Sequence, residues 1–261
     1  MVDRIYAVMN NWVLVALPMF IFMGLMLDES GVAERLMNAM TRLFGTVRGG
    51  LAITVTLIGI VLAASTGIVG ASVVLLGVLS LPTMLQNNYS KTLATGTIAA
   101  SGTLGILIPP SIMLVIMADQ MALSVGDLFM AAMIPGMLLG TIYLLYIFIV
   151  AQLRPNMAPA PEGAKRPDWD AVKDVAIAVL PTLALILAVL GSIFAGITTP
   201  TEAAAVAVAY AAFVGLFVYR ELDLPQLWKV CVDSAVVTAQ VMIIISAAAA
   251  FSWYLTSTGI T

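Results

Sequence analysis

The sequence predicts an all-α polytopic membrane protein, and two observations carry this prediction. Of the 261 residues, 62% are hydrophobic and only 10% are charged, whereas a soluble domain carries about 25% charged residues. Six apolar stretches are also long enough to cross the ~30 Å hydrocarbon core of a bilayer, which takes about 20 helical residues. These stretches lie near residues 10–27, 92–118, 128–152, 174–197, 202–220 and 234–256.

The composition also excludes several classes of function. The chain has no His, one Cys (Cys231) and a net charge of −3, which argues against thiolate or imidazole metal sites and against nucleic acid as a partner. The predicted spans contain charged residues only at their ends, namely Asp174, Glu202 and Arg220, so no acid–base or nucleophile–base pair is available in their interiors. We therefore expect a protein that is not an enzyme and that has no organic cofactor.

Residues 49–86 do not fit one span or two. The apolar run 51–64 is ~21 Å long as a helix, too short to cross, and it is followed by the glycine- and hydroxyl-rich run 65–72 and a second apolar run, 73–85. Two short helices joined by such a tip predict a re-entrant helical hairpin. The alternative is one long tilted helix whose small residues form a packing seam.

The distribution of basic residues favours the hairpin. If 49–86 enters and leaves by one face, every loop that contains Lys or Arg falls on the same side, and the loops 119–127 and 197–201, which have neither, fall on the other. By the positive-inside rule the basic side is cytoplasmic. The basic loops are 28–50, 87–91, 153–173 and 220–233.

The stretch 92–118 contains a predicted break, at Gly102–Ser111. Pro109 and Pro110 lack the backbone donor of a regular helix, and Pro110 drives Pro109 out of the α region. Backbone freed at membrane depth must line a cavity, a protein interface or an ion site, and secondary transporters build midplane sites from such broken helices.

Hydroxyls and open backbone are the chemistry that these two elements offer. Ser and Thr oxygens with helix-end carbonyls suit a hard monovalent cation such as Na⁺, and free amides at half-helix N-termini suit a carboxylate. Gly/Ser/Thr clusters also serve simply as helix–helix packing surfaces, and that reading stays open here. The hydroxyl candidates are Ser65, Thr66, Ser72, Thr97, Ser101 and Thr103.

The chain divides at a proline-rich segment, 153–173, which we expect to be a semi-rigid cytoplasmic linker. Residues 1–48 are expected to be scaffold or arm helices. Residues 49–152 are expected to be half of a transport domain, made of the hairpin 49–86, the broken helix 92–118 and the helix 128–152. Residues 174–261 are expected to be further scaffold helices and the start of a second repeat. Leu25–Val32 faintly resembles Trp253–Ile260, and the two would start copies of opposite orientation, as in inverted-topology repeats.

Four motifs, in order along the chain, resemble the large membrane subunit of tripartite ATP-independent periplasmic (TRAP) transporters. They are residues 64–71 (ASTGIVGA), 81–85 (LPTML), 100–112 (ASGTLGILIPPSI) and 199–203 (TPTEA). The resemblance covers essentially the whole chain. It implies a Na⁺-coupled, elevator-type importer in a bacterial or archaeal cytoplasmic membrane. It also implies a small membrane subunit as partner, and a periplasmic binding protein that delivers a small carboxylate such as a C4-dicarboxylate, a 2-oxo acid or a sialic acid.

The resemblance also implies roles for individual residues. Gly67, Gly70, Gly102, Thr103, Pro109 and Pro110 fall where the family places half of its substrate site, and Ser65, Thr66, Ser72 and Ser101 fall at one Na⁺ site. The family's second hairpin and second broken helix would follow Thr261, so residues 1–261 alone are not expected to complete a transport cycle. The alternative function is a large subunit of another Na⁺- or H⁺-coupled anion carrier of this fold, acting without a binding protein.

Overall fold

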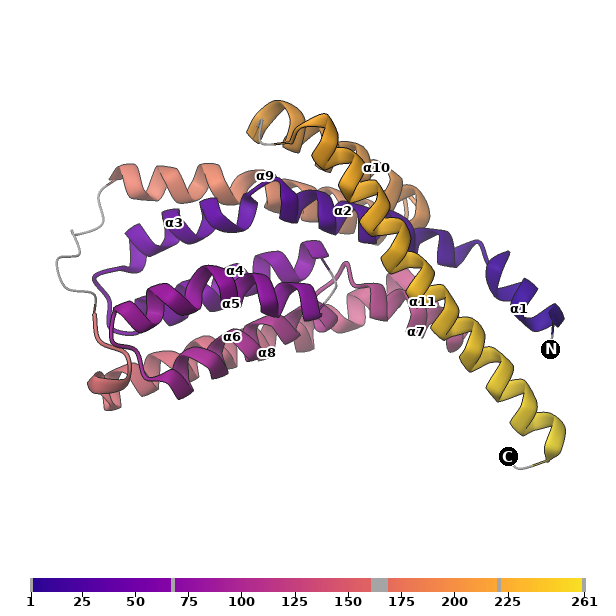
Figure 1. Ribbon diagram of the computed structural model, residues 1–261, viewed down its shortest axis with the longest axis horizontal. Helices are drawn as coiled ribbons and strands as arrows, with labels where there is room; N and C mark the ends of the chain where they lie inside the picture. The colour runs from indigo at the N-terminus through magenta and orange to yellow at the C-terminus, as the bar shows by residue number, and fades with distance from the viewer. Residues whose placement is uncertain (1, 67–68, 161–168, 220–221, 260–261) are drawn as a thin grey trace.

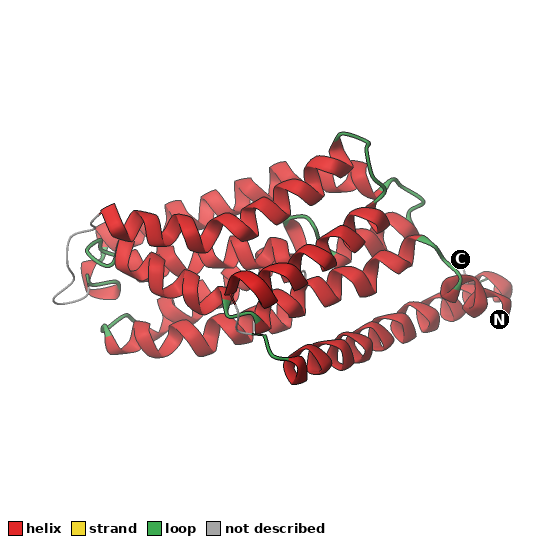
Figure 2. Ribbon diagram, turned by 90° about the horizontal axis from the view of Figure 1, so that it is seen from above, coloured by secondary structure: helices red, strands yellow, loops and turns green. Residues whose placement is uncertain are grey.

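The protein is an assembly of long helices (Figures 1 and 2). The computed structural model describes residues 2–66, 69–160, 169–219 and 222–259, and within these ranges it contains helices and no strand. The first six helices are α1 (Val2–Met9), α2 (Ala16–Glu29), α3 (Val32–Phe44), α4 (Gly50–Thr66), α5 (Val69–Gln86) and α6 (Lys91–Leu107). The rest are α7 (Ile112–Gln120), α8 (Val125–Leu153), α9 (Trp169–Phe194), α10 (Pro200–Phe213) and α11 (Leu224–Thr258), with short turns η1 (Val13–Val15), η2 (Pro155–Met157) and η3 (Val214–Tyr219).

Four described helical segments are long and apolar enough to cross a membrane: α8, α9, α10 continued by η3, and α11. Two bent pairs also qualify if each counts as one span, namely α2 with α3, bent by 54°, and α6 with α7, bent by 43°. Each of the six predicted stretches falls on one of these helices or pairs. The prediction of an all-α polytopic membrane protein is therefore confirmed.

The observed helices differ from the predicted ranges in several places. Helix α2 begins only at Ala16, and most of the predicted loop 28–50 is helix α3. Helix α9 already begins at Trp169, so residues 169–173 of the predicted linker are helical. Helix α11 has 35 residues and begins at Leu224, ten residues before the predicted stretch. Both extensions contain charged residues, which end a hydropathy signal without ending a helix.

Residues 49–86 form two helices rather than one. Helices α4 and α5 lie side by side and both pack against α6 (Figure 1). Helix α4 has 17 residues and α5 has 18, fewer than the about 20 that a span takes. Helices α6, α7 and α8 complete this part of the molecule, and α1, α2, α3, α9, α10 and α11 form the remainder. That the α4–α5 pair enters and leaves by one membrane face stays a prediction, as does the division of the chain into scaffold and transport parts.

The ends of the hairpin that lie away from its tip are held together by backbone and tyrosine contacts. Tyr89, in the α5–α6 connection, is 3% exposed, and its hydroxyl oxygen accepts the N–H of Leu51 at 3.3 Å. The segment after α8 supplies two carbonyls: Ala158 accepts the N–H of Gly49 at 3.1 Å, and Met157 accepts the N–H of Ser90 at 3.0 Å. Met157 and Ala158 therefore link the start of α6 to the start of α4 through these two hydrogen bonds.

The N-terminus of α10 is a capping box, which a Thr followed three residues later by Glu favours. The backbone N–H of Thr199 donates to Oε2 of Glu202 at 2.8 Å, and the N–H of Glu202 donates to Oγ1 of Thr199 at 3.3 Å. Pro200 occupies the first helical position, where its missing N–H costs nothing.

Candidate substrate and ion site

The broken helix is interrupted between Leu107 and Ile112. Pro109 and Pro110, joined by a cis peptide bond, cannot donate to the carbonyls of Gly105 and Ile106 as a regular helix requires. The hydroxyl of Ser111 replaces one of these donors, since its Oγ donates to the carbonyl of Ile106 at 2.9 Å. The Gly105 carbonyl is left without its regular helical donor.

The second half of the break presents amides. Ser111 precedes α7 in an extended conformation, and its side chain makes no capping hydrogen bond. The first amides of α7 therefore lack intrahelical partners, and such a terminus carries a partial positive charge that favours anions. Residues 108–112 are buried, so the break lies inside the protein and not on its outer surface.

Eight residues before Pro109, helix α6 fits tightly between α4 and α5. A Cβ atom on Gly59 of α4 would lie 2.7 Å from Cβ of Ser101, and a Cβ on Gly102 would lie 2.2 Å from Cγ2 of Val73 and 3.1 Å from its Cα. Both glycines are thus required by close helix approach. This contact also places the start of α5, which includes the buried Ser72, against residues Ser101 and Gly102 of α6.

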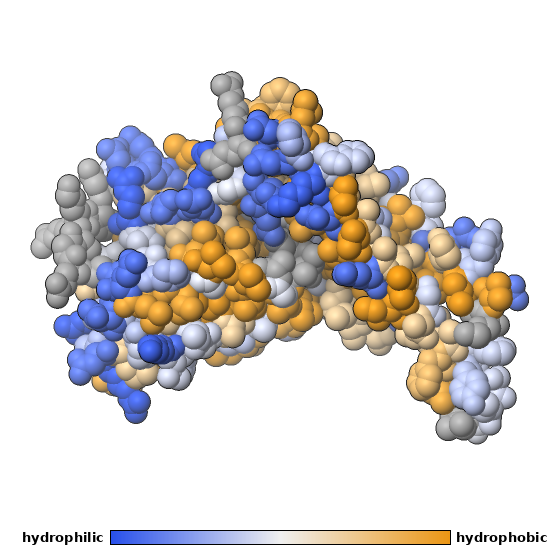
Figure 3. Space-filling view, viewed as in Figure 1, coloured by the Kyte–Doolittle hydropathy of each residue, from blue (hydrophilic) through white to orange (hydrophobic). Residues whose placement is uncertain are grey.

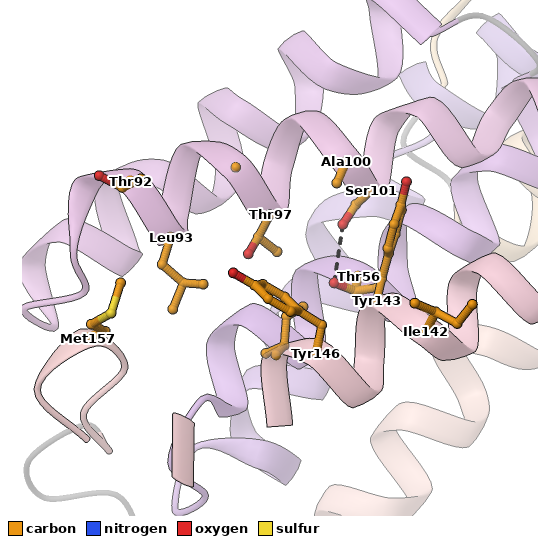
Figure 4. Close-up of a pocket in the computed structure, with 12 residues that line it drawn as sticks. Thr56, Thr92, Leu93, Thr97, Ala100, Ser101, Ile142, Tyr143, Tyr146 and Met157 are labelled. Carbon is orange, nitrogen blue, oxygen red and sulfur yellow. Dashed lines mark hydrogen bonds between the residues drawn. The ribbon is translucent and has the colours of Figure 1, made fainter. Parts of the chain in front are cut away.

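A cavity of about 380 Å³ opens beside Ser101, between α4, α6 and α8. In Figure 4 the side chains of Ser101 and Thr56 point toward each other, and the rings of Tyr143 and Tyr146 flank them. The Oγ of Ser101 donates to Oγ1 of Thr56 at 3.2 Å, and Thr56 donates in turn to the carbonyl of Ala52 at 3.0 Å. The lining also includes Thr92, Leu93, Gly96, Thr97, Ala100, Ile142, Ile147 and Met157.

The structure brings only some of the predicted site residues together. Gly102, next to Ser101, lies against Val73 at the α5–α6 contact, and the buried Ser72 directly precedes Val73. Thr103 is exposed and donates to the carbonyl of Ala100 at 2.7 Å. Pro109 and Pro110 lie beyond the end of α6, eight and nine residues after Ser101.

The predicted hairpin tip is only partly described. Gly70 is exposed, and a Cβ there would have no neighbour within 4 Å. Gly67 lies outside the described residues, and so do the side chains of Ser65 and Thr66. Of the predicted tip residues, the structure therefore describes only Gly70 and Ser72 in full.

The sequence did not indicate two residues of this cavity, Thr56 and Tyr143, or a buried carboxylate outside it, Asp28. Thr56 is one of two threonines in an otherwise apolar run, and Tyr143 is one of several aromatic residues in an apolar stretch. Neither residue therefore gave a sequence signal for this cavity. Asp28 was placed just beyond the first span, but α2 continues to Glu29, and one carboxylate oxygen of Asp28 is buried without a hydrogen-bond partner among the described residues.

The donors around Ser101 are neutral oxygens. Within the described ranges, no three His, Cys, Asp or Glu side chains come together as a metal site. Hydroxyl and carbonyl oxygens suit a hard cation, and the amides at the start of α7 suit a carboxylate. The arrangement thus offers the two kinds of group that bind a cation and an organic anion.

A multi-pass helical protein with a helical hairpin, a broken helix and uncharged oxygen donors beside them belongs structurally with membrane transporters. The family model described as the tripartite ATP-independent periplasmic transporter, DctM component, matches residues 1–261, and the chain belongs to this family. It is therefore a multi-pass protein of the bacterial inner membrane and not an enzyme.

Named relatives give the same assignment. The chain is 39% identical over 254 residues to the C4-dicarboxylate TRAP transporter large permease protein DctM of Pseudomonas aeruginosa, covering 97% of this chain and 58% of that protein. It is 34% identical to the DctM of Rhodobacter capsulatus, covering 98% of this chain and 60% of that one. It is 31% identical to the sialic acid TRAP transporter large permease protein SiaM of Vibrio cholerae, covering 94% and 56%. The chain thus spans somewhat more than half the length of these relatives.

Proposed function

We propose that this chain provides the first half of the transport site in a Na⁺-coupled importer of small carboxylates. The observation that carries the proposal is the hydrogen bond between Ser101 and Thr56, next to the close approach of Gly102 to Val73, the residue after Ser72. Ser101 and Gly102 lie on the helix that is broken at Pro109 and Pro110. A site built from neutral oxygens and backbone amides binds a cation and an anion without a charged side chain.

Na⁺ would bind near the hairpin tip, with Ser101 and Ser72 as the described donors and Ser65 and Thr66 as the others. The proton of Ser101 is directed to Thr56, which leaves the lone pairs of its Oγ for a cation. Gly67, Gly70, Gly102 and Thr103 would shape the substrate site. A carboxylate would be held at the amides that follow Pro109 and Pro110.

Family membership supports the proposed substrate class and partners. A C4-dicarboxylate, a 2-oxo acid or a sialic acid would be delivered by a periplasmic binding protein, and a small membrane subunit would complete the complex. In an elevator cycle, residues 49–152 would move against the helices of 1–48 and 174–261.

The test is uptake into proteoliposomes that contain the permease carrying these residues, the small membrane subunit and the binding protein. Succinate, pyruvate and N-acetylneuraminate are supplied in turn under an inward Na⁺ gradient, and with K⁺ in its place. We expect uptake of one of them that requires both Na⁺ and the binding protein. Uptake without the binding protein would instead support a carrier that works alone, and uptake driven only by a proton gradient would reject Na⁺ coupling.

A further inference from the structure

A second cavity, of about 270 Å³, lies between α3 and α9, on the other part of the molecule from the break. Its α3 wall carries two arginines and an asparagine on one helix face, since they are spaced at i, i+3 and i+7. Its α9 wall combines one acidic side chain with two apolar ones. Tyr219, at the end of η3, closes the cavity. The lining residues are Arg35, Asn38, Ala39, Arg42, Asp174, Ile177, Ala178 and Tyr219.

Both guanidinium groups are held in place by neighbours. Nη2 of Arg35 donates to the carbonyl of Tyr219 at 3.3 Å, and its Cζ lies 4.9 Å from the centre of the Tyr219 ring. Nη1 of Arg42 lies 2.5 Å from Oδ2 of Asp174. A guanidinium has five N–H donors in a planar fork that matches phosphate oxygens, so each group is oriented by a protein contact and is suited to a phosphate ligand.

The charge of the lining fits a monoanion. Arg35 and Arg42 contribute two positive charges and Asp174 one negative charge, and Asn38 adds neutral amide donors. The excess of one positive charge complements a phosphodiester. Arg42 and Asp174 have side chains 64% and 43% exposed, so a ligand can reach the pair from outside.

By the positive-inside rule, we expect the cavity to lie at the depth of the lipid headgroups on the cytoplasmic side. The basic loops 28–50 and 153–173 assign this end of α3 and α9 to the cytoplasm. Trp169, exposed at the start of α9, is the kind of residue that marks the membrane interface, and Asp174 lies ~7.5 Å farther along the helix. Figure 3 shows hydrophilic residues gathered at this end of the molecule.

An apolar track continues from the cavity along α9. Ile177, Leu180 and Leu187 are each exposed by two thirds or more, and their spacing places them on one side of the helix. A soluble phosphate would use the arginines but not this track. A phospholipid would use both, with its headgroup in the cavity and an acyl chain along the track.

We propose that the α3–α9 cavity binds the phosphate of an anionic phospholipid from the cytoplasmic leaflet. Arg35, Asn38 and Arg42 bind the phosphodiester, and the exposed face of α9 receives an acyl chain. Anionic lipids are attracted to basic pockets at the cytoplasmic surface of membrane proteins. The bound lipid would join the amphipathic α3 to α9.

The purified chain in dodecyl maltoside is titrated with dioctanoyl phosphatidylglycerol, and binding is measured by native mass spectrometry and by microscale thermophoresis. Dioctanoyl phosphatidylcholine tests the need for net negative charge, and glycerol 3-phosphate tests a soluble anion. We expect phosphatidylglycerol to bind at least tenfold more tightly than either.

Variants locate the site. Arg42→Gln and Arg35→Gln should each weaken phosphatidylglycerol binding about tenfold, whereas Arg154→Gln, which removes an exposed arginine outside the cavity, should change it less than twofold. Asp174→Asn should keep or strengthen binding, because it removes the one carboxylate in the lining. Melting temperatures of all variants control for folding, and Arg42→Gln is at an exposed position that folding tolerates.

The proposal fails if phosphatidylglycerol binds the wild type and Arg42→Gln equally, or if Arg154→Gln is as damaging as Arg42→Gln. It also fails if glycerol 3-phosphate binds as tightly as phosphatidylglycerol, which would make this a soluble-anion site. Equal binding of phosphatidylcholine would remove the charge argument and overturn the assignment to anionic lipid.

Discussion

The Oγ of Ser101 on α6 donates a hydrogen bond to Oγ1 of Thr56 on α4, across 3.2 Å and 45 residues of sequence. The hydroxyl of Thr56 in turn donates a hydrogen bond to the carbonyl of Ala52. Both protons in this chain therefore point to protein acceptors. The remaining lone pairs of the Ser101 oxygen are free to bind a cation. An anion would instead need a hydroxyl proton, and both protons are already donated to protein oxygens.

Replacing Ser101 by Ala tests this assignment. If Ser101 is a Na⁺ ligand, Ser101→Ala should raise the half-saturating Na⁺ concentration for uptake about tenfold, the equivalent of ~1.4 kcal/mol. Thr56→Val should have a smaller effect, because Thr56 only orients the Ser101 proton. The control is Thr95→Ala, which removes an exposed hydroxyl of α6 that donates to the Lys91 carbonyl. An unchanged Na⁺ dependence with a lowered melting temperature would assign Ser101 to packing alone.

Gly102→Ala should destabilise the α5–α6 contact by about 1–3 kcal/mol, the usual cost of overpacking. The new Cβ would lie 2.2 Å from Cγ2 of Val73 and 3.1 Å from its backbone N and Cα, and the backbone cannot rotate away. Gly96→Ala is the matched control, since a Cβ there has no neighbour within 4 Å and replacing Gly in a helix usually adds stability. Thermal unfolding of both variants in detergent measures the difference. Equal melting temperatures would contradict the close approach.

Local chemistry made part of this structure predictable from sequence. Pro109 and Pro110 break a helix wherever they occur in one, and Thr199 with Glu202 forms a capping box from residues only three apart. Such features depend on neighbours in the chain, so composition and spacing are sufficient to predict them.

Contacts between distant helices were not predictable in the same way. That Thr56 faces Ser101, or that Arg42 meets Asp174, depends on how far one helix is shifted along another. Apolar helices with low amphipathicity carry little information about that register, because every face is compatible with burial. The three residues that reasoning from sequence missed, Thr56, Tyr143 and Asp28, all owe their surroundings to tertiary packing.

Tyr89 should make stability depend on pH in alkaline solution. Burial raises the pKa of Tyr89 to about 12, and the backbone N–H groups of Leu51 and Gly49 lower it to a smaller extent. The unfolded pKa is about 10. Because the folded pKa is the higher one, the folded state favours the protonated phenol, so its contribution is complete below pH ~10 and about 2–3 kcal/mol of it is lost as the pH rises to ~12.

The measurement compares melting temperatures of the wild type and Tyr89→Phe from pH 7 to 12. Near pH 7 the variant should be less stable by about 1 kcal/mol, because the Leu51 N–H loses its acceptor. Above pH 10 the difference should shrink and then reverse, since Phe cannot ionise. A difference that stays constant over this range would show that Tyr89 does not titrate between the folded and unfolded states.

Gly136→Ala should push α8 away from the break. A Cβ on Gly136 would lie 3.0 Å from the carbonyl oxygen of Leu107 and 3.1 Å from Cγ1 of Ile108, so α8 rests directly on the last turn of α6. We expect a loss of about 1–3 kcal/mol in stability. Adding Ile108→Ala removes the side-chain contact but not the contact with the carbonyl, so it should not restore the stability lost at Gly136. Gly191→Ala in α9, where a Cβ meets nothing within 4 Å, is the control. If Gly136→Ala melts at the wild-type temperature, the break does not depend on this support, and the Leu107 carbonyl has room to move when a ligand binds.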